Sequence, residues 1–141
     1  MPNIVRNILA VIAGLILGGI VNMAIIAISG SIIPPPAGAD MTTMEGIKAA
    51  MPLLEPRHFL MPFLAHALGT FVSALVAALI AASHQMKLAI GIGVFSLLGG
   101  ITAVMMIPAP LWFNVLDLVA AYIPMGYLGG KLVAKNSEEI Y

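Results

Sequence analysis

The residues best suited to chemistry are an acid and an imidazole that lie inside long apolar runs. Asp117 interrupts the segment NVLDLVAAYIP, residues 114–124, and His66 lies in the apolar stretch that begins after residue 58. An ionised carboxylate among lipid-like side chains is costly, so it requires a partner, and such acids often mark sites that bind or transfer ions. Asp117 and His66 therefore predict a site that handles protons or cations.

Two charge states of this pair are consistent with the sequence. A dry environment keeps a carboxyl group neutral, and Asp117 then acts as a hydrogen-bond donor. If His66 is within reach, the pair instead carries one negative and one positive charge, and the two groups titrate together. A structural alternative also stands, in which Asp117, His66 and a nearby asparagine form a hydrogen-bonded cluster that holds the helices in register.

Other chemistries lack the residues that they need. The chain has no cysteine, which excludes disulfides and thiolate catalysis, and it has neither a zinc motif of the HExxH kind nor a nucleotide-binding glycine loop. Ser73 and His66 lie seven residues apart on one predicted helix, too far for a catalytic triad. Haem ligation would need a second copy of the chain, because His58, His66 and His84 fall at three depths. We therefore expect no enzyme activity, no metal and no cofactor.

The composition identifies the environment of these residues. Of 141 residues, 61% are hydrophobic and 9% are charged, and the mean hydropathy is +1.08. Soluble domains are about 45–50% apolar and about 25% charged, so the chain belongs to the integral membrane class. Six basic and six acidic residues cancel, which removes the field that would attract nucleic acid. The lipid bilayer is the expected surroundings.

Four apolar segments are long enough to cross a membrane as helices, which takes about 20 residues each. The expected spans are residues 8–29, 59–82, 88–107 and 112–133, in a single domain covering 1–141. We expect an all-α fold, a polytopic four-helix antiparallel bundle. The first span is longer than the apolar core of a signal peptide and is followed by three prolines, so we interpret it as a retained helix.

Basic residues predict the orientation of the spans. Four of them, Arg6, Lys87, Lys131 and Lys135, flank one side, and only Lys48 and Arg57 lie in the loop on the other. Cytoplasmic loops carry the excess of lysine and arginine, so both termini are expected in the cytoplasm.

The outer loop, residues 30–57, is the one sizeable segment between spans. Thr42 and Glu45 have the spacing of a capping box, which predicts a short helix there. Met44, Ile47, Met51 and Leu54 would form an apolar face that lies on the membrane or on the mouth of the bundle. The loop is interpreted as a connector that covers helix ends, and a substrate lid is the alternative.

Small residues recur at helical spacing on the spans, which predicts close helix packing. Without a hydrophobic drive between helices in lipid, close backbone approach must supply association. The expected packing positions are Gly14, Gly18, Gly93, Gly100, Gly126 and Gly130.

Polar residues from all four spans are predicted at a similar depth. At about 1.5 Å per residue from the outer end, Asn22 lies roughly 11 Å deep, His66 roughly 10 Å, and Asp117 and Thr102 about 7 Å. Asn114 lies just above this level and Thr70 one turn below it. We expect these six residues to form a polar layer.

These features favour a small protein of channel or transporter type that uses the polar layer to handle protons or cations. The alternative is a non-catalytic membrane subunit or scaffold that binds other helices through its glycine faces. A third possibility is a site for a hydrophobic ligand in a cleft lined by methionine. A bundle of this size has little room for a water-filled route, so a homo-oligomer or a membrane protein partner is expected. No motif identifies a family.

Overall fold

The computed structural model describes residues 1–138 of the chain, and every element in this range is helical. The elements in chain order are α1 (Asn3–Ile32), α2 (Met44–Ala50), the 3₁₀ turns η1 (Met51–Leu53) and η2 (Pro56–Phe59), α3 (Leu60–Ile80), α4 (Gln85–Met106), α5 (Leu111–Ala120) and α6 (Ile123–Glu138). The all-helical expectation is confirmed for the described residues.

Four helical segments in this range are long and apolar enough to cross a membrane: Asn3–Ile32, Pro56–Ile80, Gln85–Met106 and Leu111–Ala134. They correspond to the four predicted spans, and the first begins five residues earlier than expected. This is the character of a multi-pass membrane protein.

The expectation of one continuous helix over residues 112–133 is wrong. The helix ends at Ala120 as α5 and begins again at Ile123 as α6. Pro124 explains the break, because it has no N–H to donate to the carbonyl of Ala120 and its ring would clash with that carbonyl. As the second residue of α6, the same proline is well tolerated, since the first helical N–H groups need no partner within the helix.

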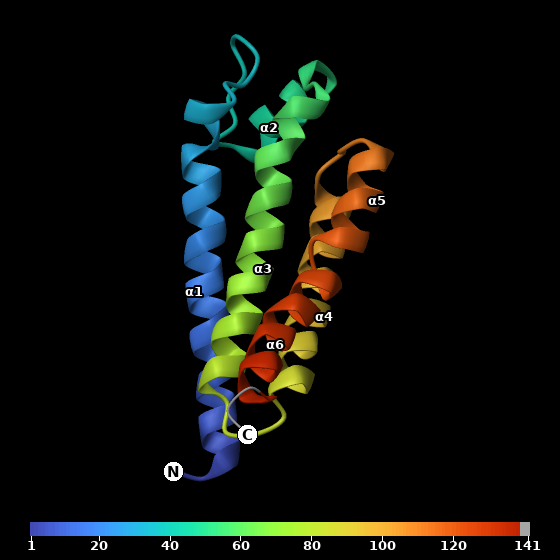
Figure 1. Cartoon of the computed structure of the whole chain (residues 1–141). Helices are drawn as coiled ribbons and strands as arrows, with labels where there is room; N and C mark the ends of the chain where they lie inside the picture. The colour runs from blue at the N-terminus through green and yellow to red at the C-terminus, as the bar shows by residue number, and fades with distance from the viewer. Residues whose placement is uncertain (139–141) are drawn as a thin grey trace.

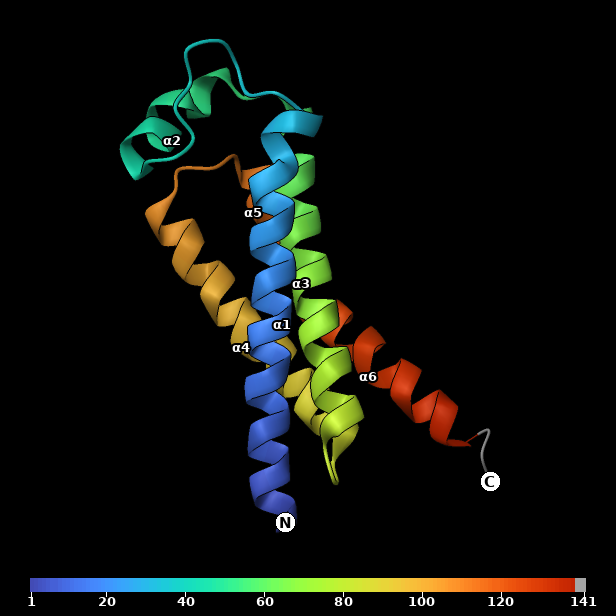
Figure 2. The same cartoon turned by 90° about the vertical axis from the view of Figure 1, so that its left-hand side faces the viewer.

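Helix α3 is central to the arrangement. It lies beside α1 along most of its length, and α4 and α6 pack against it from the other side (Figure 1). At the end of the molecule where α2 lies, α4 leans away from α1 and α3 (Figure 2).

The beginning of α1 is joined to the end of α3 by hydrogen bonds. Arg6 Nε donates to the carbonyl of Ile80 at 2.6 Å. Asn7 Oδ1 accepts from the backbone N–H of Ala82 at 2.9 Å, and its amide nitrogen donates to Ser83 Oγ at 3.1 Å. Asn7 therefore satisfies groups of the turn after α3 that would otherwise lack partners.

The glycines Gly14 and Gly18 bring α1 close to α3. Both are buried, and a Cβ atom added to Gly18 would overlap Ser73 Oγ and the carbonyl of Gly69. A Cβ on Gly14 would overlap the carbonyl of Ser73. Only glycine allows this backbone approach. We call this contact the α1–α3 seam.

The remaining predicted glycines lie at contacts of α4 and α6. A Cβ on Gly126 would meet the carbonyl of Ala89 at 2.8 Å, and one on Gly93 would meet the backbone of Ile123 at 3.1 Å. Gly100 faces the ring of Tyr122, and Gly130 faces Ala89 and Met86. By contrast, no described atom lies within 4 Å of a Cβ placed on Gly19, Gly91 or Gly99.

The outer loop contains the expected short helix, but its cap differs from the prediction. Thr43, not Thr42, is the N-cap of α2, and its hydroxyl accepts from the N–H of Gly46 at 3.0 Å. Thr42 instead donates its hydroxyl and its backbone N–H to Asp40. These two hydrogen bonds stabilise the carboxylate and lower the pKa of Asp40.

Candidate functional site

Asp117 is the one buried acid among the side chains that the structure describes. It lies on α5, is 4% exposed, and faces α3 rather than the outside of the bundle. Aromatic contacts hold α5 in this position, since the Phe59 ring before α3 packs on Phe113 at 4.8 Å and on Trp112 at 5.4 Å between centroids. A buried carboxylate in such a place needs hydrogen-bond donors.

His66 on α3 supplies the first donor. Its Nδ1 lies 2.8 Å from Oδ1 and 3.0 Å from Oδ2 of Asp117, and its side chain is 29% exposed. The acid thereby selects the imidazole form that carries a proton on Nδ1. Among the described residues Nε2 has no hydrogen-bond partner, so this nitrogen is the one available to a proton or ligand.

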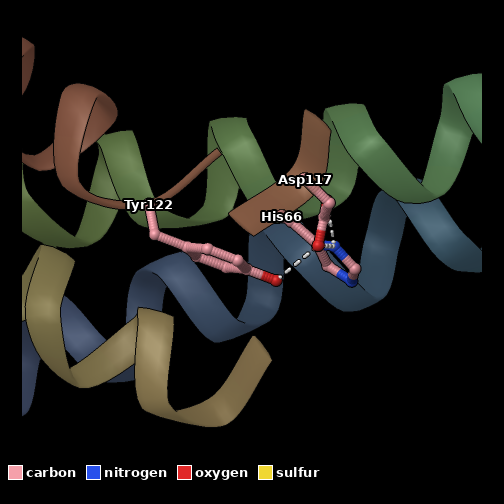
Figure 3. Close-up of polar contacts among 3 residues, drawn as sticks. All are labelled: His66, Asp117 and Tyr122. Atoms are coloured by element: carbon pink, nitrogen blue, oxygen red, sulfur yellow. Dashed lines mark hydrogen bonds and ion pairs between the residues drawn. The ribbon is translucent and has the colours of Figure 1, made fainter. Parts of the chain in front are cut away.

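Tyr122 supplies the second donor. Its hydroxyl donates to Asp117 Oδ2 at 2.9 Å, and its ring stacks on that of His66 at 5.8 Å between centroids (Figure 3). Tyr122 is five residues after Asp117, a spacing that would point the two side chains apart on a continuous helix. The break between α5 and α6 turns Tyr122 back toward the acid.

Together, His66, Asp117 and Tyr122 form what we call the acid triplet. The imidazole nitrogen and the tyrosine hydroxyl both donate to one carboxylate, and the imidazole can gain a second proton at Nε2 without breaking either bond. The triplet can thus change its net charge by one while its hydrogen bonds persist.

Two cavities meet at the acid triplet. The first, which we call the outer cavity, measures about 320 Å³, lies beneath the outer loop and reaches Asp117 and His66. The second, the cleft, measures about 270 Å³, lies between α1, α3 and α4, and reaches His66 and Tyr122. Three residues line both: His66, Gly100 and Ala103. His66 is therefore part of the wall between two spaces.

The other predicted members of the polar layer divide between these cavities, with one exception. Asn22 and the buried Thr70 line the cleft, but among the described residues Asn22 makes no hydrogen bond to the triplet, and its amide nitrogen lies 3.9 Å from the sulfur of Met23. Asn114 lines the outer cavity and donates to the carbonyl of Ala109 at 3.3 Å.

Thr102 is the exception, and its place in the predicted layer needs correction. It is exposed on α4, and its hydroxyl donates to the carbonyl of Leu98 in the same helix at 3.0 Å. Its depth agrees with that of the other polar residues, but its direction around the helix axis does not. A threonine that bonds its own helix in this way needs no partner in the bundle.

Tyr122 and Ser73 are site residues that the predicted layer did not include. Ser73 is buried, lines the cleft and lies on the α1–α3 seam. For Tyr122 the available signal was Pro124, which predicts a helix boundary one or two residues earlier.

The donor set of the site does not resemble a metal centre. Among residues 1–134, whose side chains the structure describes, there is no group of three or more histidine, aspartate or glutamate residues that could hold a metal ion. Asp117 already accepts two hydrogen bonds from within the triplet.

The chain matches no protein-family model, no curated protein and no solved structure.

Proposed function

We propose that this chain is a small multi-pass membrane protein of channel or transporter type that moves protons or monovalent cations past the acid triplet. In this proposal the helices form an antiparallel bundle in the bilayer, with both termini in the cytoplasm. The supporting observation is that His66 lines both the outer cavity and the cleft while it is hydrogen-bonded to a buried acid.

The charge chemistry of the triplet supports proton transfer between the two spaces. Asp117 lines the outer cavity, and Tyr122 lines the cleft. A proton taken up at His66 is balanced by Asp117, so the uptake does not leave an isolated charge among apolar helices. A change in the rotation or separation of the helices would then let His66 release the proton into the cleft.

The scaffold alternative has less support. The six predicted packing glycines contact helices of the same chain, so they are not free to receive helices of another protein. Association with a second copy or with a partner remains part of the proposal, because the cleft is open between α1 and α4 and a neighbouring helix would close it.

A flux assay in proteoliposomes tests this function. The purified chain would be reconstituted with an internal pH dye, and proton flux would be measured under an imposed potential, with K⁺ and Na⁺ fluxes measured in parallel. We expect a flux above that of protein-free liposomes. Asp117→Asn should remove most of it, because the amide keeps the shape of the carboxyl group but cannot balance a charge at His66.

Asp40→Asn is the matched control, since it makes the same change in the exposed outer loop and should leave the flux unchanged. The proposal is wrong if the wild-type chain transports none of these ions at any pH. It is also wrong if folded Asp117→Asn protein transports them as fast as the wild type.

A further inference from the structure

The outer cavity combines an apolar lining with one acidic side chain, that of Asp117. The lining comes from seven helical elements, α1 to α5 with η1 and η2, and its apolar residues include Ile26, Ile47, Met51, Leu54, Phe59 and Phe113. Its other polar side chains are those of Ser29, His58, His66 and Asn114. Pockets of this size and character typically hold a small ligand with one polar group that fixes its orientation.

The charges around this cavity are of one sign when His66 is neutral. The titratable residues that line the two cavities are His58 from η2, His66 from α3, Asp117 from α5 and Tyr122 from the break between α5 and α6. Within residues 1–138, α1 and α4 contribute no titratable group to either space.

His58 does not balance the acid. Its Nδ1 accepts from the N–H of Glu55 at 2.8 Å and its Nε2 lies 3.2 Å from the carbonyl of Pro34, a pattern that requires a neutral ring. The nearby Arg57 pairs with Glu55 at 2.9 Å on the surface. When His66 is neutral, no positively charged side chain lining the cavity therefore balances the negative charge of Asp117.

We propose that the outer cavity binds a lipophilic monocation, an apolar body that carries one amine, with its ammonium group directed at Asp117 and Asn114. The apolar body replaces water along the wall, which is favourable by about 25 cal/mol per Å² of apolar surface. The ammonium group supplies the positive charge that the buried acid lacks. This inference rests on the proposed function, for which it names the class of transported ligand.

Other occupants fit the cavity less well. An anion would meet Asp117 without a cationic side chain to offset the repulsion. A neutral hydrocarbon or a lipid chain would cover the wall but leave the acid without a partner for its charge. A bound ammonium group and a second proton on His66 would compete for the same negative charge on Asp117.

Three probes with the same apolar body test the proposal. The full-length chain in lipid nanodiscs would be titrated calorimetrically with 2-phenylethylammonium, 2-phenylethanol and 3-phenylpropionate, with empty nanodiscs as the blank. We expect the amine to bind at least about tenfold more tightly than the alcohol, and the acid to bind least, because only the amine pairs with Asp117. Asp117→Asn should abolish the preference for the amine.

A second variant keeps the test valid if Asp117→Asn does not fold. Met51→Trp fills the outer cavity from the loop without touching the acid triplet, and it should weaken amine binding. Met105→Trp is its control, because Met105 is 82% exposed on α4 and lines neither cavity, and it should bind as the wild type does.

The results separate this inference from the proposed function. The inference is overturned if no probe binds, if the alcohol or the acid binds as tightly as the amine, or if folded Asp117→Asn protein keeps the amine preference. Ion flux without amine binding overturns the inference alone. Amine binding without any ion flux retains the cavity as a cation site and overturns the ion-transport function.

Discussion

At the scale of single residues, Asp117 illustrates how a buried charge is accommodated in an apolar fold. Its carboxylate is 4% exposed and accepts hydrogen bonds from His66 and Tyr122. Bonds to an ionised group are stronger than neutral ones, and removal of a donor leaves the acceptor without compensation. Removal of any one of these three side chains should therefore lower the free energy of unfolding, because it weakens the hydrogen bonding of the other two.

Tyr122→Phe tests this expectation. The change keeps the ring that packs against Gly100 and removes only the hydroxyl that donates to Asp117. We expect the free energy of unfolding to fall by about 1–3 kcal/mol, as for other hydrogen bonds to charged groups. The measurement is unfolding in mild detergent, followed by the fluorescence of Trp112.

Tyr127→Phe is the matched control for that experiment. Tyr127 lies five residues after Tyr122, on α6, but is 44% exposed, and its ring faces the ammonium group of Lys131. Loss of its hydroxyl should change stability by less than about 0.5 kcal/mol. Equal effects of the two substitutions would contradict a special role for the bond between Tyr122 and Asp117.

At the scale of elements, two helix contacts determine where the site residues lie. The α1–α3 seam fixes the wall of the cleft that carries Asn22, and the contact of α4 with α6 fixes Tyr122 beside Gly100. Both contacts depend on small residues that let backbones approach closely. A larger side chain should therefore destabilise the fold where it faces one of these contacts, and should have little effect on the opposite face of the same helix.

Gly18→Leu and Gly19→Leu form a matched pair that tests this sensitivity. Leucine at Gly18 would overlap Ser73 and the backbone of Gly69, so α1 must move away, and we expect a loss of about 1–3 kcal/mol or more in stability. A Cβ atom at Gly19 meets no described atom within 4 Å, so Gly19→Leu should change stability little. Thermal denaturation in detergent compares the two. Similar melting temperatures for the two variants would show that the seam does not hold the fold together.

At the scale of the whole molecule, the basic residues used to predict the orientation are distributed between its two ends. The N-terminus, the turn at residues 81–84 and the described end of α6 lie at one end, and α2 lies at the other (Figure 1). Arg6 and Lys87 belong to the first end, and Lys48 and Arg57 to the second. The side chain of Lys135, also used in predicting the orientation, lies outside those that the structure describes.

The proposed topology can be measured with single cysteines, because the chain has none of its own. Ala37→Cys in the exposed outer loop should react with a membrane-impermeant maleimide in intact cells. Asn3→Cys should react only after the membrane is permeabilised, since the proposed topology, based on the excess of basic residues, places this end in the cytoplasm. Labelling in the opposite pattern would reverse the assigned orientation.

Much of the architecture follows from local sequence. The four apolar segments were predictable because crossing a membrane requires length and hydropathy, which are properties of a continuous stretch. Helical spacing likewise identified Gly14 and Gly18 as residues of one face, and the apolar run around Asp117 identified it as an acid in need of a partner. The cap of α2 was predicted one residue early, because Thr42 and Thr43 both suit that position and only the local fold distinguishes them.

The sequence by itself thus determined the apolar segments, their small-residue faces and the buried acid, because each depends on residues close together in the chain. The tertiary structure alone decided that Thr102 faces outward, that the break before Pro124 directs Tyr122 to Asp117, and that the lean of α4 opens two cavities at His66. Depth along a helix can be counted from residue numbers. Rotation about the helix axis and the angle between helices depend on packing among residues far apart in sequence, and these two quantities create the site.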